Sequence, residues 1–565
     1  MDGNKTMFSL STIGRRSQKK KKKTETPTMH FSLKQLAVAA FYATNLGSAY
    51  VIPQFFQEAF QQEEPIENYL PQLNDDDSSA VAANIPKPHI PYFMKPHVES
   101  EKLQDKIKVD DLNATAWDLY RLANYSTPDY GHPTRVIGSK GHNKTMEYIL
   151  NAFDDMQDYY DVSLQEFEAL SGKIISFNLS DAETGKSFAN TTAFALSPPV
   201  DGFVGKLVEI PNLGCEEKDY ASVVPPRHNE KQIALIERGK CPFGDKSNLA
   251  GKFGFTAVVI YDNEPKSKEG LHGTLGEPTK HTVATVGVPY KVGKKLIANI
   301  ALNIDYSLYF AMDSYVEFIK TQNIIADTKH GDPDNIVALG AHSDSVEEGP
   351  GINDDGSGTI SLLNVAKQLT HFKINNKVRF AWWAAEEEGL LGSNFYAYNL
   401  TKEENSKIRV FMDYDMMASP NYEYEIYDAN NKENPKGSEE LKNLYVDYYK
   451  AHHLNYTLVP FDGRSDYVGF INNGIPAGGI ATGAEKNNVN NGKVLDRCYH
   501  QLCDDVSNLS WDAFITNTKL IAHSVATYAD SFEGFPKRET QKHKEVDILN
   551  AQQPQFKYRA DFLII

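Results

Sequence analysis

Three short apolar segments, each followed by residues that can bind a metal, constrain the fold of this chain most. They are Asn335–Leu339, Lys377–Trp383 and Ile408–Met412. Segments of this length and composition predict buried strands, and the sequence between them has helical periodicity. Strands that alternate with helices predict an α/β protein with a doubly wound sheet, in which ligands bind beyond the C-terminal strand ends.

Acidic residues follow all three predicted strands, and a histidine follows the first. His342 and Asp344 follow the first strand in AHSDS, and Asp354 comes next in GINDDGSG. Glu386–Glu387 follow the second strand, and Asp415 follows the third. His342 and Asp344 share one side of extended chain because side chains alternate with period two. An imidazole among carboxylates predicts a divalent metal site, with zinc as the first expectation.

A further histidine lies between two cysteines near the end of the chain. His500 is part of CYHQLC, where Cys498 and Cys503 are close enough for a local disulfide. The chain has four cysteines, in two distant pairs, and this favours two bridges in an oxidising compartment over a four-thiolate zinc site. One zinc needs only three protein ligands. At least five candidate ligands therefore indicate two metals.

The N-terminal residues predict entry into the secretory route. Residues 1–28 form a basic extension with 8 basic and 2 acidic side chains, and 29–49 have the pattern of a signal peptide. Residues 50–84 are acidic and predict a pro-segment or linker, so the protein would be a zymogen. The apolar run of the signal peptide is too short for a transmembrane anchor. A net charge of −17 argues against nucleic acid as a partner.

Eight glycosylation sequons follow the predicted signal peptide. Their asparagines are Asn113, Asn124, Asn143, Asn178, Asn190, Asn399, Asn455 and Asn508. A single N-x-[ST] triplet is weak evidence, but eight behind a signal peptide predict a glycoprotein.

The sequence also changes character along the rest of the chain. Residues 85–190 predict the N-terminal part of a catalytic domain, including an amphipathic helix over Ser139–Met156. Residues 191–315 predict a mainly β insertion, because short β runs and turns replace the helical pattern. The α/β pattern resumes over 316–535, and 536–565 form a charged tail.

Six motifs between Ala341 and Cys503 resemble the co-catalytic zinc aminopeptidase family of metallopeptidases. They are AHSDS, GINDDGSG, FAWWAAEEEGLLGS, DYDMMASPN, GRSDY and CYHQLC, in the family's order. The resemblance implies a zinc-peptidase sheet flanked by helices and two Zn²⁺ per chain. It implies that His342 and Asp415 hold one zinc, that Glu387 and His500 hold the other, and that Asp354 bridges them.

The same resemblance implies roles for further residues. Glu386 would be the general base, and Asp344 would orient His342. Tyr499 would stabilise the oxyanion, and Arg464 would line the substrate cleft. The implied reaction is hydrolysis of the N-terminal peptide bond of peptides with a free α-amine, with zinc-bound hydroxide as the attacking group.

Two segments of the insertion resemble a protease-associated domain. They are KQIALIERGKCPF at 231–243 and KFGFTAVVIYD at 252–262. The resemblance implies a disulfide between Cys215 and Cys241. Such a domain usually has no catalytic groups, so we expect it to restrict access to the cleft or to bind partners, with an inert spacer as the alternative.

Three alternative functions stay open at this point. One is a carboxypeptidase of the same architecture, and the second is a metal-free binding glycoprotein. The third is a glutaminyl cyclase. The expected partners are peptide substrates and a processing protease that removes the pro-segment. The expected location is the lumen of a vacuole or lysosome-like compartment, or the extracellular space.

Overall fold

One mixed sheet of 13 strands runs through the described part of the chain, in the order β12-β11-β13-β10-β8-β9-β7-β3-β4-β5-β6-β2, with β1 paired to β7. The computed structural model describes residues 90–223, 230–268, 270–538, 558–559 and 562–565. The basic extension, signal peptide and pro-segment predicted over residues 1–84 lie outside the described residues.

Four parallel strands form the part of the sheet that carries the predicted site residues. They are β8 (Asp332–His342), β9 (Asn376–Trp383), β10 (Ile408–Tyr414) and β13 (Ala477–Ala481). Neighbours in the order β13-β10-β8-β9 pair in parallel, so their C-terminal ends lie at one edge of the sheet. The predicted α/β fold with a large mixed sheet is confirmed.

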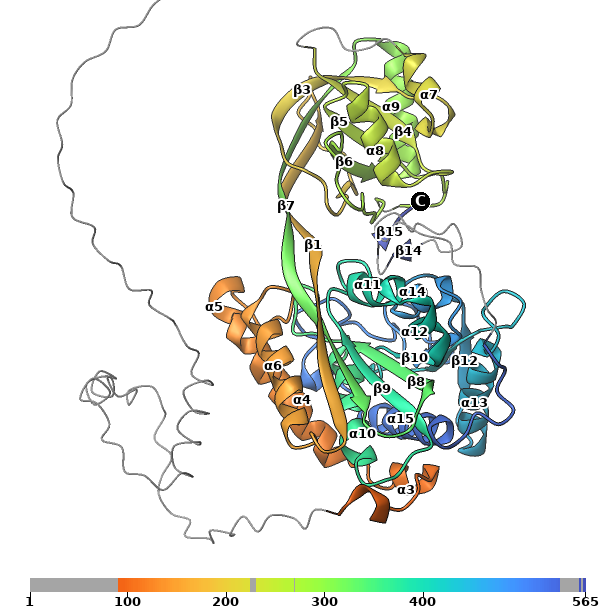
Figure 1. Ribbon diagram of the computed structural model, residues 1–565. Coiled ribbons are helices and arrows are strands. Elements are labelled where there is room, and N and C mark those ends of the chain that lie inside the picture. The colour runs from red at the N-terminus through yellow and green to blue at the C-terminus, as the bar shows by residue number, and fades with distance from the viewer. Residues whose placement is uncertain (1–89, 224–229, 269, 539–557, 560–561) are drawn as a thin grey trace, which may run out of the picture. The chain divides into compact units, whose positions relative to one another are not determined.

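Side chains of these strands alternate between two hydrophobic cores because strand side chains have period two. Leu339 and Trp382 join the core under helices α10 and α15, whereas Ala338 and Trp383 join the core under α11 and α14. The helices are α10 (Gly356–Leu369), α11 (Leu391–Asn399), α14 (Tyr467–Asn472) and α15 (Trp511–Asp530). Helices on both faces explain why the strands are apolar almost throughout (Figure 1).

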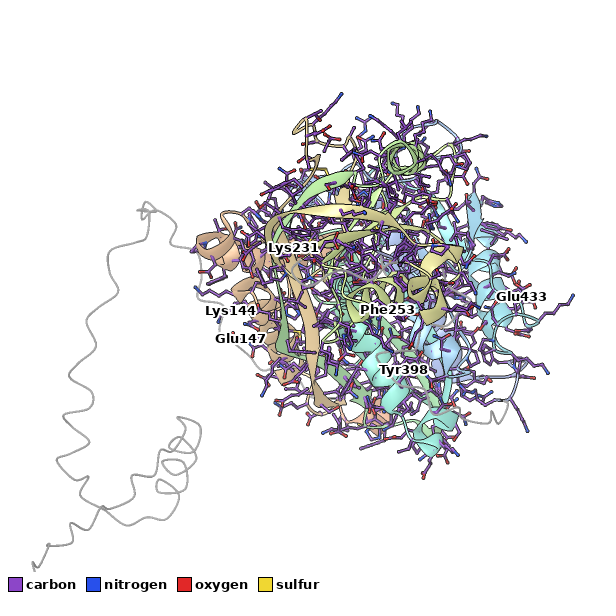
Figure 2. The ribbon with its side chains drawn as sticks, turned by 90° about the horizontal axis from the view of Figure 1, so that it is seen from above. Lys144, Glu147, Lys231, Phe253, Tyr398 and Glu433 are labelled. Carbon is purple, nitrogen blue, oxygen red and sulfur yellow. A yellow bond between two sulfur atoms is a disulfide. The ribbon has the colours of Figure 1, made fainter. Side chains whose placement is uncertain are left out.

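Helix α6 (Lys140–Asp154) matches the amphipathic helix expected from the sequence. The Ser139 side chain accepts a hydrogen bond from the His142 N–H and caps its first turn. Lys144 and Glu147 form an ion pair of 2.6 Å on the exposed face of the helix. Both residues are labelled in Figure 2. The opposite face joins the core shared with α4 (Val109–Ala123) and α10.

A long antiparallel ribbon links this part of the sheet to the inserted domain. β1 (Tyr160–Asp181) and β7 (Ser307–Thr328) pair from end to end. β7 also pairs with β9 near its C-terminal end and with β3 near its N-terminal end (Figure 1). The domain boundary predicted at residue 316 therefore falls inside a continuous strand.

The inserted domain has its own parallel strands and hydrophobic clusters. The strands are β3 (Val200–Glu209), β4 (Gln232–Glu237), β5 (Ala257–Tyr261) and β6 (Ala284–Val288). Its helices are α7 (Glu217–Ala221), α8 (Phe243–Lys252) and α9 (Tyr290–Leu302). A disulfide joins Cys215 and Cys241.

Most of the remaining elements are short. They are α3 (Ser100–Gln104), α5 (Thr127–Tyr130), α12 (Lys402–Lys407), α13 (Ser438–Ala451), β2 (Thr192–Ala193), β11 (Tyr424–Tyr427), β12 (Tyr456–Val459), β14 (Tyr558–Arg559), β15 (Phe562–Leu563), and the 3₁₀ turns Tyr92–Met94, Asn124–Ser126, Asn212–Gly214 and Val506–Asn508. Within the described ranges, every helix is too short or too polar to cross a membrane.

Candidate metal centre and active site

His342 is the last residue of β8, and its imidazole is buried with no hydrogen-bond partner on either nitrogen. Its Nε2 atom lies 3.2 Å from Asp354 Oδ1 and 3.8 Å from Asp415 Oδ1. Its backbone N–H donates to Asp355 Oδ2 (3.0 Å), which fixes the end of the strand. A buried nitrogen without a partner is costly. A metal ion at this position would satisfy it.

Asp354 lies between two histidines in the loop that leads into α10. Its Oδ1 atom faces His342, and its Oδ2 atom lies 3.1 Å from His500 Nε2. Asp504 Oδ2 accepts the backbone N–H of Asp354 (3.0 Å) and holds this loop in place. Each carboxylate oxygen of Asp354 therefore faces a different imidazole, as a bridging ligand requires.

Glu387 lies beside His500 in the same cluster. Its Oε2 atom lies 3.1 Å from His500 Nε2. Its Oε1 atom accepts the backbone N–H of Val346 (3.2 Å). A disulfide between Cys498 and Cys503 closes the loop that carries His500.

Glu386 is almost fully buried, and its Oε1 atom has no hydrogen-bond partner. Its Oε2 atom lies 3.9 Å from His342 Nε2. Asp344 accepts the backbone N–H groups of Glu386 (3.3 Å) and Glu387 (3.2 Å), so it fixes the loop after β9. The distance from Asp344 Oδ1 to His342 Nδ1 is 3.7 Å, which is longer than a hydrogen bond.

Burial and mutual repulsion dominate the electrostatics of this cluster. Burial, with repulsion from Asp354, raises the pKa of Asp415 to about 8. Burial also raises the pKa of Glu386 well above its usual range, although His342 opposes this shift. At His342 burial opposes protonation, but Glu386 and other carboxylates outweigh it and raise the pKa of the imidazole. Cations placed between these groups would relieve the repulsion, and the mixed imidazole and carboxylate donors fit zinc.

One cleft brings most of the predicted site residues together. Asp354, Glu386, Glu387, Asp415, Arg464, Tyr499 and His500 line it. The Tyr499 ring stacks on the His500 imidazole at 3.9 Å between centroids. Arg464 forms an ion pair with Glu485 (2.9 Å) at the rim. His342 lies behind this lining, buried at the end of β8.

Three buried residues that sequence reasoning missed support the centre. Asp355 accepts the N–H groups of His342 and Met416, and thereby couples two strand ends. Asp504 holds the Asp354 loop, as described above. Arg135 contacts the loop between His342 and Asp354. Asp355 lies in the GINDDGSG motif directly after Asp354, and this position was the only signal for it in the sequence.

One predicted glycosylation site is wrong. Asn508 is buried, and its amide donates to Asp496 and to Asp504 at 3.0 Å. A glycan on this nitrogen would break the contacts that hold Asp504 and would not fit in the folded protein. The other seven sequon asparagines are exposed.

Buried carboxylates and histidines lie together beyond the ends of parallel strands, which is an arrangement suited to a metal-dependent enzyme of the α/β class. Residues 323–525 match the family model described as Peptidase family M28, and residues 203–296 match the PA domain.

Known proteins with similar sequences and structures agree with these matches. Leucine aminopeptidase 2 of Trichophyton tonsurans is 40% identical over 479 residues, which cover 81% of this chain and 92% of that protein. A probable leucine aminopeptidase 2 of Aspergillus fumigatus is 41% identical over 464 residues, covering 79% and 88%. The structure of an aminopeptidase from Aneurinibacillus sp. strain AM-1 aligns with a TM-score of 0.64 and 25% identity, covering 79% and 99%. The chain therefore belongs to peptidase family M28 and is a zinc-dependent aminopeptidase with a PA domain.

Proposed function

We propose that this aminopeptidase uses two zinc ions bridged by Asp354 to remove N-terminal residues from peptides. His342 and Asp415 would hold one ion, and Glu387 and His500 would hold the other. The observation that carries this proposal is the position of Asp354, whose two oxygens lie 3.2 and 3.1 Å from the two imidazoles. Zinc ions held there would supply Lewis acidity and a nucleophilic water at neutral pH.

Glu386 is the proposed general base. Its unpartnered Oε1 atom is free to accept a proton from the attacking water and to return it to the leaving amine. The bonds from the Glu386 and Glu387 N–H groups to Asp344 hold this carboxylate beside the ligand Glu387.

Tyr499 and Arg464 have proposed roles on the wall of the cleft. The Tyr499 ring is fixed against His500, which supports its assignment as the donor to the developing oxyanion. Arg464 lies on the lining with its guanidinium paired to Glu485, and it would help to shape the substrate site. Carboxylates near the metals would bind the free α-amine of the substrate.

The disulfides and glycosylation sequons bear on where the enzyme works. Two disulfides and seven exposed sequons support passage through an oxidising compartment. We propose a glycoprotein of the vacuolar lumen or the extracellular space, whose pro-segment is removed by a processing protease.

The proposed activity can be tested by asking whether hydrolysis requires a free N-terminal amine. An aminopeptidase hydrolyses a dipeptide with a free N-terminus and leaves its N-acetylated form intact. Rates on both peptides should differ by more than about a hundredfold, because an uncharged amide cannot pair with the carboxylates of the cleft. Equal hydrolysis of the blocked peptide would indicate a carboxypeptidase instead.

A further inference from the structure

Arg135 is a fully buried arginine in the loop between α5 and α6. Its guanidinium donates three hydrogen bonds: from Nη1 to the Ser343 carbonyl (2.5 Å), from Nε to the Pro350 carbonyl (2.8 Å) and from Nη2 to the Gly351 carbonyl (2.5 Å). All three acceptors belong to residues 343–351, which we call the connecting loop. Arg135 therefore holds both ends of this loop at once.

The connecting loop joins two of the proposed metal ligands. It begins immediately after His342 and ends three residues before Asp354. The Gly351 carbonyl also accepts the Gly356 N–H (3.0 Å) at the start of α10. A displacement of either end of the loop would therefore move a ligand or the helix that follows it.

The local backbone is shaped to admit the guanidinium. Gly351 has φ of +57°, and a Cβ atom there would lie 3.2 Å from Arg135 Nη2 and 2.2 Å from the Asp354 carbonyl oxygen. The Arg135 N–H donates to Ser345 Oγ (2.9 Å), and Ser345 in turn donates to the Gly349 carbonyl (2.9 Å). Main chain and side chain of Arg135 thus both bind the connecting loop.

Arg135 carries its charge without a contacting carboxylate. Among the described residues it makes no ion pair within 4.0 Å, and its partners are the three carbonyls. A buried guanidinium is costly unless it is well hydrogen bonded. Burial lowers the pKa of Arg135, whereas the charges of Asp344 and Asp355, among others, oppose that shift.

We infer that Arg135 is a positioning residue that holds His342 and Asp354 in register for metal binding. The inference rests on the proposed two-zinc function. The planar fork of arginine bonds three carbonyls in fixed directions, whereas a lysine offers one flexible ammonium. Replacing Arg135 by lysine therefore keeps the positive charge but removes the geometry of the guanidinium.

The test measures zinc affinity of the metal-free full chain by competition with a chromophoric chelator. Arg135→Met and Arg135→Lys are both expected to weaken zinc binding by about 10–100-fold, as other residues that orient metal ligands do. Lysine restores the charge without the fork, so recovery of full affinity in Arg135→Lys would overturn the positioning role. Circular dichroism establishes that each variant is folded at the assay temperature.

Arg379 provides a matched control. It is a mostly buried arginine of β9, bonded to Asp327 through Nε and Nη2 (both 2.6 Å) and to Tyr396 (2.6 Å), outside the proposed ligand set. Arg379→Met is expected to lower the midpoint of thermal unfolding and to leave zinc affinity unchanged. Equal losses of zinc affinity in the Arg135 and Arg379 variants would overturn the inference.

Ser345→Ala keeps the test decisive if the Arg135 variants do not fold. It removes the acceptor of the Arg135 N–H without leaving a buried charge, and we expect a smaller loss of zinc affinity, about 3–10-fold. Unchanged affinity in this variant would overturn the inference. Failure of the wild-type chain to bind zinc would instead overturn the proposed function, so the two failures are distinguishable.

Discussion

At the residue scale, the buried carboxylates of Asp354 and Glu386 are suited to different roles. Both oxygens of Asp354 face imidazoles, so this residue is suited to hold metals together. Glu386 keeps one oxygen without a partner, so it is suited to carry a proton. Their environments, rather than their residue type, separate a proposed ligand from a proposed base.

We predict that Glu386→Gln retains its zinc and loses turnover. The amide keeps the shape of the side chain but cannot accept the proton, and general-base catalysis contributes about 10²–10⁴ in rate. Zinc content per chain and kcat measured on the same sample test this. Glu403→Gln, an exposed substitution in α12, serves as the control and keeps wild-type kcat. A Glu386→Gln enzyme with near-normal kcat would remove Glu386 from the mechanism.

Single residues could be predicted from the sequence only where a motif marked them. The residues of AHSDS, GINDDGSG and CYHQLC were placed correctly in one cluster because each follows a strand or lies in a short loop. Arg135 could not be predicted, since its carbonyl partners lie more than 200 positions away in the chain. Glycosylation of Asn508 was predicted wrongly, because a sequon carries no information about the burial of its asparagine.

At the element scale, the ends of β8, β9 and β10 bring the site together. Parallel pairing places the residues after these strands at one edge of the sheet. Helix α10 starts in the same region, with Asp355 as its N-cap. Helix α15 covers the strands from one face and carries His523, a largely buried histidine.

His523 predicts acid sensitivity of the fold. Burial, with the charge of His452, lowers the pKa of His523 to about 4 from 6.5. Between these values the unfolded chain binds more protons than the folded protein, so stability falls as pH falls. The full shift corresponds to about 3 kcal/mol. Urea unfolding at pH 7, 5.5 and 4 should show a smaller loss for His523→Gln than for the wild type.

The control for this prediction is Leu302→Gln, an exposed substitution at the end of α9 that removes no titratable group. It should keep the wild-type dependence of unfolding free energy on pH. The same pH dependence in His523→Gln and the wild type would show that His523 does not contribute.

Helices and strands could be predicted where the periodicity of apolar residues in the sequence was clear. The apolar strands β8, β9 and β10 and the amphipathic helix α6 appear close to their expected positions. The length of β7 was not predictable, since one end is buried in the catalytic sheet and the middle is largely exposed. Its burial pattern changes because different partners cover it, and this depends on tertiary structure rather than on local sequence.

At the scale of the whole molecule, the M28 residues and the PA domain share one sheet. β7 pairs with β9 on one side and with β3 on the other, so the inserted domain is joined to the peptidase by a continuous strand. The ribbon of β1 and β7 is therefore hydrogen bonded directly to β9, which precedes Glu386 and Glu387.

Zinc content measured together with activity tests the central claim most directly. Purified, processed enzyme prepared without chelators should contain two zinc ions per chain and hydrolyse a free-amine aminoacyl chromogenic substrate. Asp354→Ala should lose both ions and the activity together, because each imidazole faces one oxygen of Asp354. Full activity with a single zinc, or an active Asp354→Ala enzyme, would contradict a bridged two-zinc centre.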